Sequence, residues 1–143
     1  MRPRVRVMCC IAGGDLDLAE ISRILGVTTM STRLKEDFPE VSQRMGFAHD
    51  EWVYALPRVE CASISERLEA LEGVFGDRAG QIFAIRESYA ARVSVELFVH
   101  AVIGDEPDLT LARGNLAFFD SLGAELGIDP YVYYPDEADE LPP

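Results

Sequence analysis

The fold is decided by the stretch RVRVMCCIAGGDLDLAEISRILG, residues 4–26, in which a two-residue repeat gives way to a helical one. Residues 4–12 first alternate polar and apolar side chains and then become wholly apolar. That pattern predicts a central strand, covered on both faces near its end. The glycine pair and aspartate at 13–15 then predict a turn, so the chain leaves the strand abruptly.

The second half of this stretch predicts an amphipathic helix. Asp17 and Glu20 have the spacing of a capping box, which satisfies the first backbone donors of a helix. Apolar side chains recur at helical spacing between Leu18 and Leu25 and form one apolar stripe. Gly26 follows as a C-terminal stop, because glycine readily adopts the left-handed backbone that ends a helix.

The rest of the chain alternates strand and helix patterns. We expect, in order, a short strand at 27–32, a long surface loop at 33–50, a strand at 52–59, a helix from 63 to 75 that breaks at 76–77 and resumes, a strand at 92–103, a short helix at 113–122 and a last strand at 124–134. Pro130 places that last strand at a sheet edge.

This order predicts an α+β fold. The first six elements match a ferredoxin-like β-α-β-β-α-β sandwich, which a short C-terminal helix and an edge strand extend. We expect a single domain over residues 1–134, followed by an acidic, mobile tail over residues 135–143.

Composition indicates a cytoplasmic protein whose core needs no disulfide or metal ion. The 143 residues are 48% hydrophobic, and nowhere do 18 apolar residues run together, so we expect no membrane association. The apolar run at 7–12 is too short for a signal peptide. Cys9, Cys10 and Cys61 have apolar neighbours and no zinc-site spacing, so we expect three buried, reduced thiols.

The net charge of −12 is unevenly distributed. Residues 1–60 carry eight basic and nine acidic groups, whereas residues 61–143 carry five basic and sixteen acidic groups. A fixed negative field repels phosphate backbones and anionic lipids and attracts basic surfaces. We therefore expect a basic protein partner and no nucleic acid.

The segment DLDLAEISRILGVTT, residues 15–29, resembles the opening of a bacterial family known as domain of unknown function 4279. Glu51-Trp52 and Leu122-Gly123-Ala124 are further correspondences, and together they cover most of residues 7–134. Thr28-Thr29 stand where the family has Pro-Thr. The resemblance implies the fold and a bacterial origin. It implies no catalytic residues, and by analogy it favours an immunity-type or accessory role.

No group of residues in the sequence has the spacing of a known catalytic site. Glu96 and His100 share a strand face, but residues four apart on a strand are roughly 13 Å apart. His49, Asp50 and Glu51 contain metal-ligand types without a further ligand at suitable spacing. No serine lies in a nucleophile elbow, and the glycines at 13–14 lack the rest of a phosphate loop. We therefore expect no catalytic, cofactor or metal residues, and no enzyme.

An aromatic sheet face is the strongest candidate site. In a ferredoxin-like sandwich the helices cover one sheet face and leave the other open. Alternation would bring five candidate partner-binding residues to that open face: Trp52, Tyr54, Leu56, Phe98 and His100. A face this apolar needs a cover, either the C-terminal elements or another chain, including a second copy in a homodimer.

The sequence therefore favours a non-enzymatic protein-binding module, of immunity or regulatory type, for a basic partner. The alternative is a small-ligand sensor that uses the aromatic face as a pocket. A third hypothesis is an enzyme whose site lies around the loop at 33–51. The first two differ in one observable: a ligand pocket requires Trp52 and Tyr54 to line a closed cavity, whereas an interface requires them to be exposed.

Overall fold

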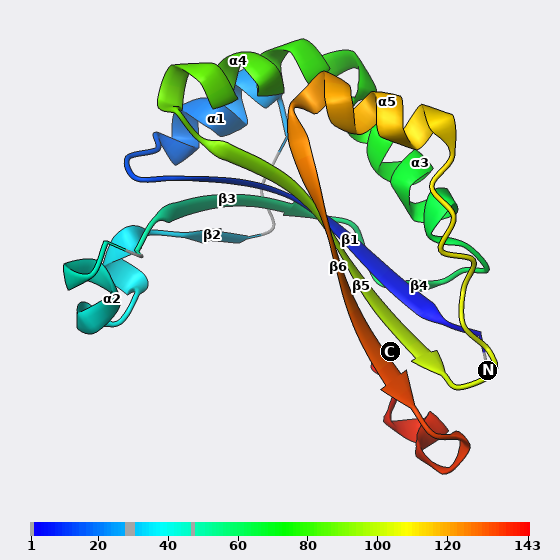
Figure 1. Ribbon diagram of the computed structural model, residues 1–143. Coiled ribbons are helices and arrows are strands. Elements are labelled where there is room, and N and C mark those ends of the chain that lie inside the picture. Colours follow the sequence, from blue (N-terminus) through cyan, green and yellow to red (C-terminus); the bar gives the residue numbers. More distant parts are fainter. Residues whose placement is uncertain (1, 28–30, 47) are drawn as a thin grey trace.

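Strand β1 (Arg4–Gly13) runs through the middle of the sheet, as its sequence pattern predicts. It is seen in a computed structural model that describes residues 2–27, 31–46 and 48–143 (Figure 1). The other elements follow in chain order: α1 (Leu18–Leu25), β2 (Ser31–Arg33), η1 (Lys35–Asp37), α2 (Glu40–Arg44), β3 (Asp50–Ala55), β4 (Val59–Glu60), α3 (Ile64–Phe75), η2 (Gly76–Arg78), α4 (Ala79–Tyr89), β5 (Arg92–Val102), α5 (Arg113–Leu122), β6 (Ala124–Tyr133) and η3 (Pro135–Glu140).

The described residues form a six-stranded sheet in the order β2-β3-β1-β5-β6, with β4 paired to the first residues of β1. Neighbouring strands are antiparallel, except that β6 runs parallel to β5. Helices α1, α3, α4 and α5 all lie on one side of this sheet (Figure 1). We call that side the helix face and the opposite side the open face.

The predicted α+β class is therefore confirmed. The observed strand order differs from that of a four-stranded ferredoxin-like sheet, because β6 extends the sheet beyond β5 and β4 adds to the end of β1. The predicted helix at 113–122 and the predicted edge strand are both present, as α5 and β6. The edge position agrees with Pro130, since an edge strand tolerates a residue without an N–H.

The register of β1 decides which side chains form the core. Val7, Cys9 and Ile11 lie opposite Leu97, Val95 and Val93 of β5, and all six are fully buried under the helices. Residues directly opposite each other in a ladder point to the same face. The alternate positions of β1, from Arg4 to Cys10, therefore point to the open face.

The same register corrects the expected placement of three candidate residues. Ile11 lies opposite Trp52, and Cys9 lies opposite Tyr54, so both aromatic side chains belong to the helix face together with Leu56. Alternation along β3 correctly grouped these side chains, but it does not say which group meets the helices. The prediction that they lie on the open face is wrong.

Trp52 is instead a central core residue. Its side chain is 0% exposed, and its indole Nε1 donates to the Ser22 Oγ at 3.0 Å. Its ring meets Phe75 edge-on, with centroids 6.3 Å apart at an interplanar angle of 72°. Tyr54 meets the same Phe75 ring at 5.1 Å. Burial of this indole with a satisfied N–H is favourable, because both its apolar area and its donor are used.

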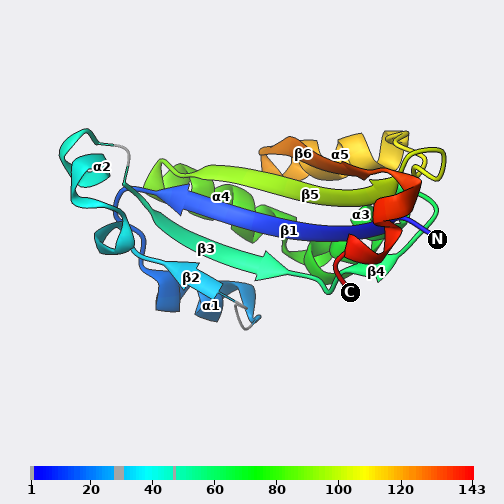
Figure 2. The ribbon, with the colours of Figure 1, turned by 90° about the horizontal axis from the view of Figure 1, so that it is seen from below.

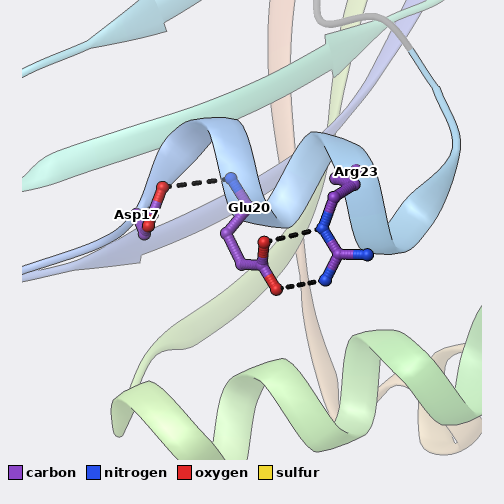
Figure 3. A network of polar contacts seen from close by, with 3 residues as sticks. All are labelled: Asp17, Glu20 and Arg23. Atoms are coloured by element: carbon purple, nitrogen blue, oxygen red, sulfur yellow. Dashed lines mark hydrogen bonds and ion pairs between the residues drawn. The ribbon is translucent and has the colours of Figure 1, made fainter.

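Helix α1 begins and ends as its sequence predicts. The Asp17 carboxylate accepts from the Glu20 backbone N–H at 3.0 Å, and Gly26 ends the helix in the left-handed region with a φ of 66°. Glu20 also pairs with Arg23 one turn on, through bonds of 2.8 and 2.5 Å (Figure 3). The exposed pair adds little stability, whereas the cap fixes where the helix begins.

Three segments differ from the sequence-based expectation. The loop predicted at 33–50 contains η1 and α2, and of the strand predicted at 27–32 the structure shows β2 from Ser31, while residues 28–30 lie outside the described ranges. The strand predicted at 52–59 is divided into β3 and β4. Pro57 lies between them, and it has no N–H to continue a ladder.

Replacing Trp52 by alanine should lower the free energy of unfolding by about 3–5 kcal/mol, because it removes a fully buried indole and leaves Ser22 without its donor. Chemical denaturation followed by circular dichroism is the measurement, since Trp52 is the only tryptophan. The matched variant Tyr131→Ala removes a partly exposed ring on the open face and should cost less than about 1.5 kcal/mol. Equal losses would contradict the assignment of Trp52 to the core.

Candidate functional site

The open face carries the candidate site, because no helix of the covering layer lies on it (Figure 2). Phe98 and His100 point to this face from β5, as predicted, and Met8 and Cys10 join them from β1. The five predicted partner-binding residues are therefore divided between the two faces. Two of them remain at the candidate surface, and three lie on the helix side.

His100 stands at the centre of an aromatic cluster that includes two residues the sequence analysis missed. Its ring stacks on Tyr131 of β6, with centroids 4.5 Å apart and an interplanar angle of 5°. Its Nδ1 is 3.0 Å from the Tyr133 hydroxyl. Tyr131 and Tyr133 alternate along β6, and the parallel register brings Tyr131 opposite His100. Their alternation was visible in the sequence, but their neighbour across the ladder was not.

The surroundings of His100 lower its pKa below the usual value of 6.5. Burial is the largest cause, since only 8% of the residue is exposed, and the positive charge of Arg58 acts in the same direction. Asp129 opposes both with a smaller effect. His100 is therefore neutral at physiological pH, and one ring nitrogen is available to share a hydrogen with Tyr133.

Three arginines gather near His100 on the open face. Arg4 lies opposite His100 in the ladder and forms an ion pair with Glu60 at 3.7 Å. Arg6 follows two residues along β1 on the same face. Arg58 precedes β4, and its Nε is buried without a hydrogen-bond partner among the described residues. This end of the face is thus locally basic in a protein whose net charge is −12.

Strand β6 and the residues that follow it are strongly acidic. Residues 124–143 contain six carboxylates and no lysine or arginine, so they account for half of the net charge. We call these carboxylates the acidic strip: Glu125, Asp129, Asp136, Glu137, Asp139 and Glu140. Asp129 accepts from the Tyr131 hydroxyl at 2.8 Å, and Glu125 pairs with Arg92 at 2.5 Å. Tyr134 stands among them with 62% of its surface exposed.

Residues 135–142, which we call the C-terminal strap, lie against the open face. The sequence predicts an acidic, mobile tail here. In the structure η3 contacts β5 and β6, Leu141 is 7% exposed, and Arg4 donates from Nη1 to the Pro142 carbonyl at 2.6 Å. Figure 2 shows the strap across the end of the sheet, where β1 begins and β5 ends.

The histidine and carboxylates at the start of β3 do not converge on a metal site. His49 pairs with Glu51 at 2.7 Å, while the Asp50 carboxylate accepts from the Leu16 and Lys35 backbone N–H groups at 3.0 and 2.8 Å. Asp50 therefore holds two loops together, beside an open crevice of about 710 Å³. Within the described residues no three His, Cys, Asp or Glu side chains are grouped to hold a metal ion.

The three cysteines are free thiols. Cys9 is buried on the helix face, and Cys10 is partly exposed on the open face. Burial is the main cause that raises the pKa of both thiols to about 12, and it is helped by the neighbouring Cys10 at Cys9 and by Glu96 and Glu51 at Cys10. Burial also raises the pKa of Cys61. None of them is an activated nucleophile, because a nucleophilic thiol needs a lowered pKa.

Comparisons with known proteins identify one family. The model of that family, described as a domain of unknown function (DUF4279), matches residues 3–133. No curated protein and no solved structure matches the chain. The matched residues end with β6, so the C-terminal strap lies beyond them. In the part of the chain that the structure describes, no helix combines the length and apolarity needed to cross a membrane.

His100 should titrate below pH 6.5 in the folded protein, measured by NMR from its ring protons. Because the unfolded state then binds more protons, the stability that neutral His100 contributes is present above about pH 6.5 and is lost as pH falls toward the folded pKa. Arg58→Gln should raise the pKa of His100, whereas Arg44→Gln on α2 should not change it. A pKa above 6.5 in the native protein would show that the cluster is open to water.

Cys9 and Cys10 should react slowly with a disulfide reagent at pH 8, since a thiol with a pKa of about 12 has a thiolate fraction of about 10⁻⁴. We expect native labelling at least about 100-fold slower than labelling in denaturant, followed by absorbance. Mass spectrometry of the labelled peptides distinguishes these thiols from Cys61. Fast native labelling of Cys9 would mean that β1 is not central.

Proposed function

Because the chain belongs to the DUF4279 family, whose function is unknown, we propose a function from its own surface: it is a non-enzymatic protein-binding module for a basic partner. We propose that the partner docks on the acidic strip and the tyrosines beside it. An accessory protein of immunity or regulatory type, working in the cytoplasm, fits this proposal. The free thiols support that compartment, since oxidising compartments favour disulfides.

The observation that carries the proposal is the acidic strip itself. Six carboxylates occur in residues 124–143 with no basic side chain to neutralise them within that segment. Asp136, Asp139 and Glu140 are exposed on η3, which holds them at one end of the open face. Such a group of exposed carboxylates repels acidic proteins and steers basic ones, and the effect weakens as salt screens it.

Tyrosines supply the apolar part of this surface. Tyr131 and Tyr134 are 42% and 62% exposed, and they flank the carboxylates of β6 and η3. Tyrosine is enriched in protein interfaces because it adds large contact area with few rotatable bonds and a polar end. The stack on His100 holds the Tyr131 ring in place before binding, so little freedom of that ring is lost on association.

A second copy fits this surface less well than a basic partner. In a two-fold dimer the same patch of each subunit meets its counterpart. Two acidic strips would then face each other, and like charges brought together across an interface are unfavourable. The homodimer remains the competing hypothesis, and sedimentation equilibrium at micromolar concentration distinguishes the two.

The small-ligand alternative has weaker support in the described residues. It required Trp52 and Tyr54 to line a closed cavity, but Trp52 is packed into the core. An apolar pocket beside Pro107 and Ile128 holds about 110 Å³, whereas ligand pockets usually measure about 300–1,000 Å³. The open crevice of about 710 Å³ beside Asp50 is large enough, but none of the five aromatic-face candidates lines it. The protein-binding hypothesis therefore stays first.

We also propose that β2, β3, β1 and β5 form a ferredoxin-like unit to which β4, α5 and β6 were added. Strand β1 connects through α1 to β2, with β3 between them in the sheet. Strand β3 likewise connects through α3 and α4 to β5, with β1 between them. Two split β-α-β crossovers with their helices on the same face of the sheet are characteristic of a ferredoxin-like fold.

Neutralising the exposed acids of η3 should slow association with the partner. The variant Asp136→Asn/Asp139→Asn/Glu140→Gln leaves Glu137 in place, because its Oε2 accepts from the Tyr134 backbone N–H. A partner isolated from extracts of the source cells on the immobilised chain is identified, and its binding kinetics are measured by surface plasmon resonance. We expect a basic protein whose association rate falls steeply between about 0.05 and 0.5 M salt.

The matched control changes the same net charge on the helix layer. Glu66→Gln/Glu69→Gln/Glu72→Gln neutralises three exposed acids of α3 and should leave association nearly unchanged. Tyr131→Ala should mainly speed dissociation, by tenfold or more if Tyr131 is a hot spot. An acidic partner, or equal effects of the two triple variants, would refute the proposed function.

A further inference from the structure

The C-terminal strap lies across the end of the open face where β5 ends. His100 and Val102 point to this end of the face and are only 8% and 9% exposed, and Tyr131 and Tyr133 of β6 already contact the His100 ring. The segment that reaches this place is the strap, since η3 contacts both β5 and β6 (Figure 2). The end of the face therefore already holds a peptide segment, which is the chain's own.

The end of the face that the strap covers is basic, whereas the strap is acidic. Arg4 lies opposite His100, Arg6 follows two residues along β1, and the positive charge of Arg58 acts on His100. The buried Nε of Arg58 lacks a hydrogen-bond partner among the described residues, so it is a donor that a carboxylate could satisfy. The strap supplies four carboxylates between Asp136 and Glu140.

Few contacts hold the strap in place. Leu141 is its buried side chain, and the Pro142 carbonyl accepts from Arg4 Nη1 at 2.6 Å. Its helix η3 is a 3-10 helix. The Glu137 carboxylate accepts from the backbone N–H of Tyr134, so this cap is local and does not tie the strap to the sheet. Among the described residues the attachment thus consists of one buried apolar side chain and one hydrogen bond to β1, and such an attachment has a low free energy of local opening.

We propose that the His100 end of the open face is a binding site for a short acidic peptide with a buried aliphatic anchor, and that residues 135–142 occupy it in cis. The site goes beyond the proposed function, because its ligand is acidic whereas the partner on the acidic strip is basic. A peptide from another protein with the same chemistry competes with the strap. Its apparent affinity is reduced by the high effective concentration of the tethered segment.

The test adds a fluorescein-labelled synthetic peptide of residues 134–143 to the full-length chain and measures anisotropy. The wild-type chain should bind it weakly, because its own strap fills the site. The full-length variant Leu141→Ser releases the anchor and should bind the peptide at least about tenfold more tightly than the wild type does. The control Leu116→Ser removes an exposed leucine from α5 and should bind like the wild type.

Two further variants locate the site. Adding Arg4→Gln to Leu141→Ser should weaken peptide binding at least about threefold, and a peptide with serine in place of its leucine should not bind. Binding that is equal for wild type and Leu141→Ser, or absent from a Leu141→Ser chain with a native circular dichroism spectrum, would overturn the proposal. These results do not depend on any basic partner, so the proposed function and this site fail separately.

Hydrogen exchange of the unmodified chain provides a measurement that needs no variant. The Glu137 amide, bonded to the Tyr134 carbonyl at 2.9 Å, should exchange at least about 100-fold faster than amides of β1. Raising salt from about 0.05 to 0.5 M should speed its exchange further, since salt screens the arginine–carboxylate attraction. Exchange of Glu137 only together with β1 would show that the strap does not open, and would overturn the proposal.

Discussion

The register of β1 against its two neighbours is the constraint on which the rest of the structure depends. β1 pairs with β3 on one side and with β5 on the other, so its pleat determines the facing of side chains across the centre of the sheet. A slip of one residue would turn Val7, Cys9 and Ile11 toward water and bring Arg4 and Arg6 under the helices. Burial of unpaired arginines is costly enough to exclude that alternative. The register of β1 therefore places the core aromatic side chains under the helices and determines which side chains form the open face.

Local patterns predicted much of the fold. The cap at Asp17, the stop at Gly26 and the alternation of β5 depend on residues close together in the chain, so the sequence contains what they need. The facing of Trp52 depends on a strand some forty positions away, and alternation alone leaves two equivalent choices. The requirement for glycine at Gly127 has the same origin, because a Cβ there would overlap the carboxylate of Glu96, its neighbour across the ladder in β5.

The candidate site was predicted in part for the same reason. Phe98 and His100 were placed on the correct face because the alternate positions of β5 are uniformly aliphatic, and such a set of side chains has to meet the helices. Tyr131 and Tyr133 were missed, since their role depends on the parallel register between β5 and β6. The net charge also does not describe the local charge of each surface. The protein carries a net charge of −12, yet the end of the sheet beside Arg4 is basic, and the last residues of the chain return across the sheet to this end.

Pro130 gives the exposed edge of β6 a property that matters outside the single molecule. A bare strand edge is a template on which other strands can add, and long flat edges lead to aggregation. Proline is tolerated at an edge where its missing N–H would have faced solvent, so the ladder that β6 offers to the outside is interrupted near its middle. Glu125 and Asp129 precede Pro130 on β6, and their negative charges oppose the approach of a second edge of the same kind. Both features make β6 a poor template for edge-to-edge growth between copies of this protein.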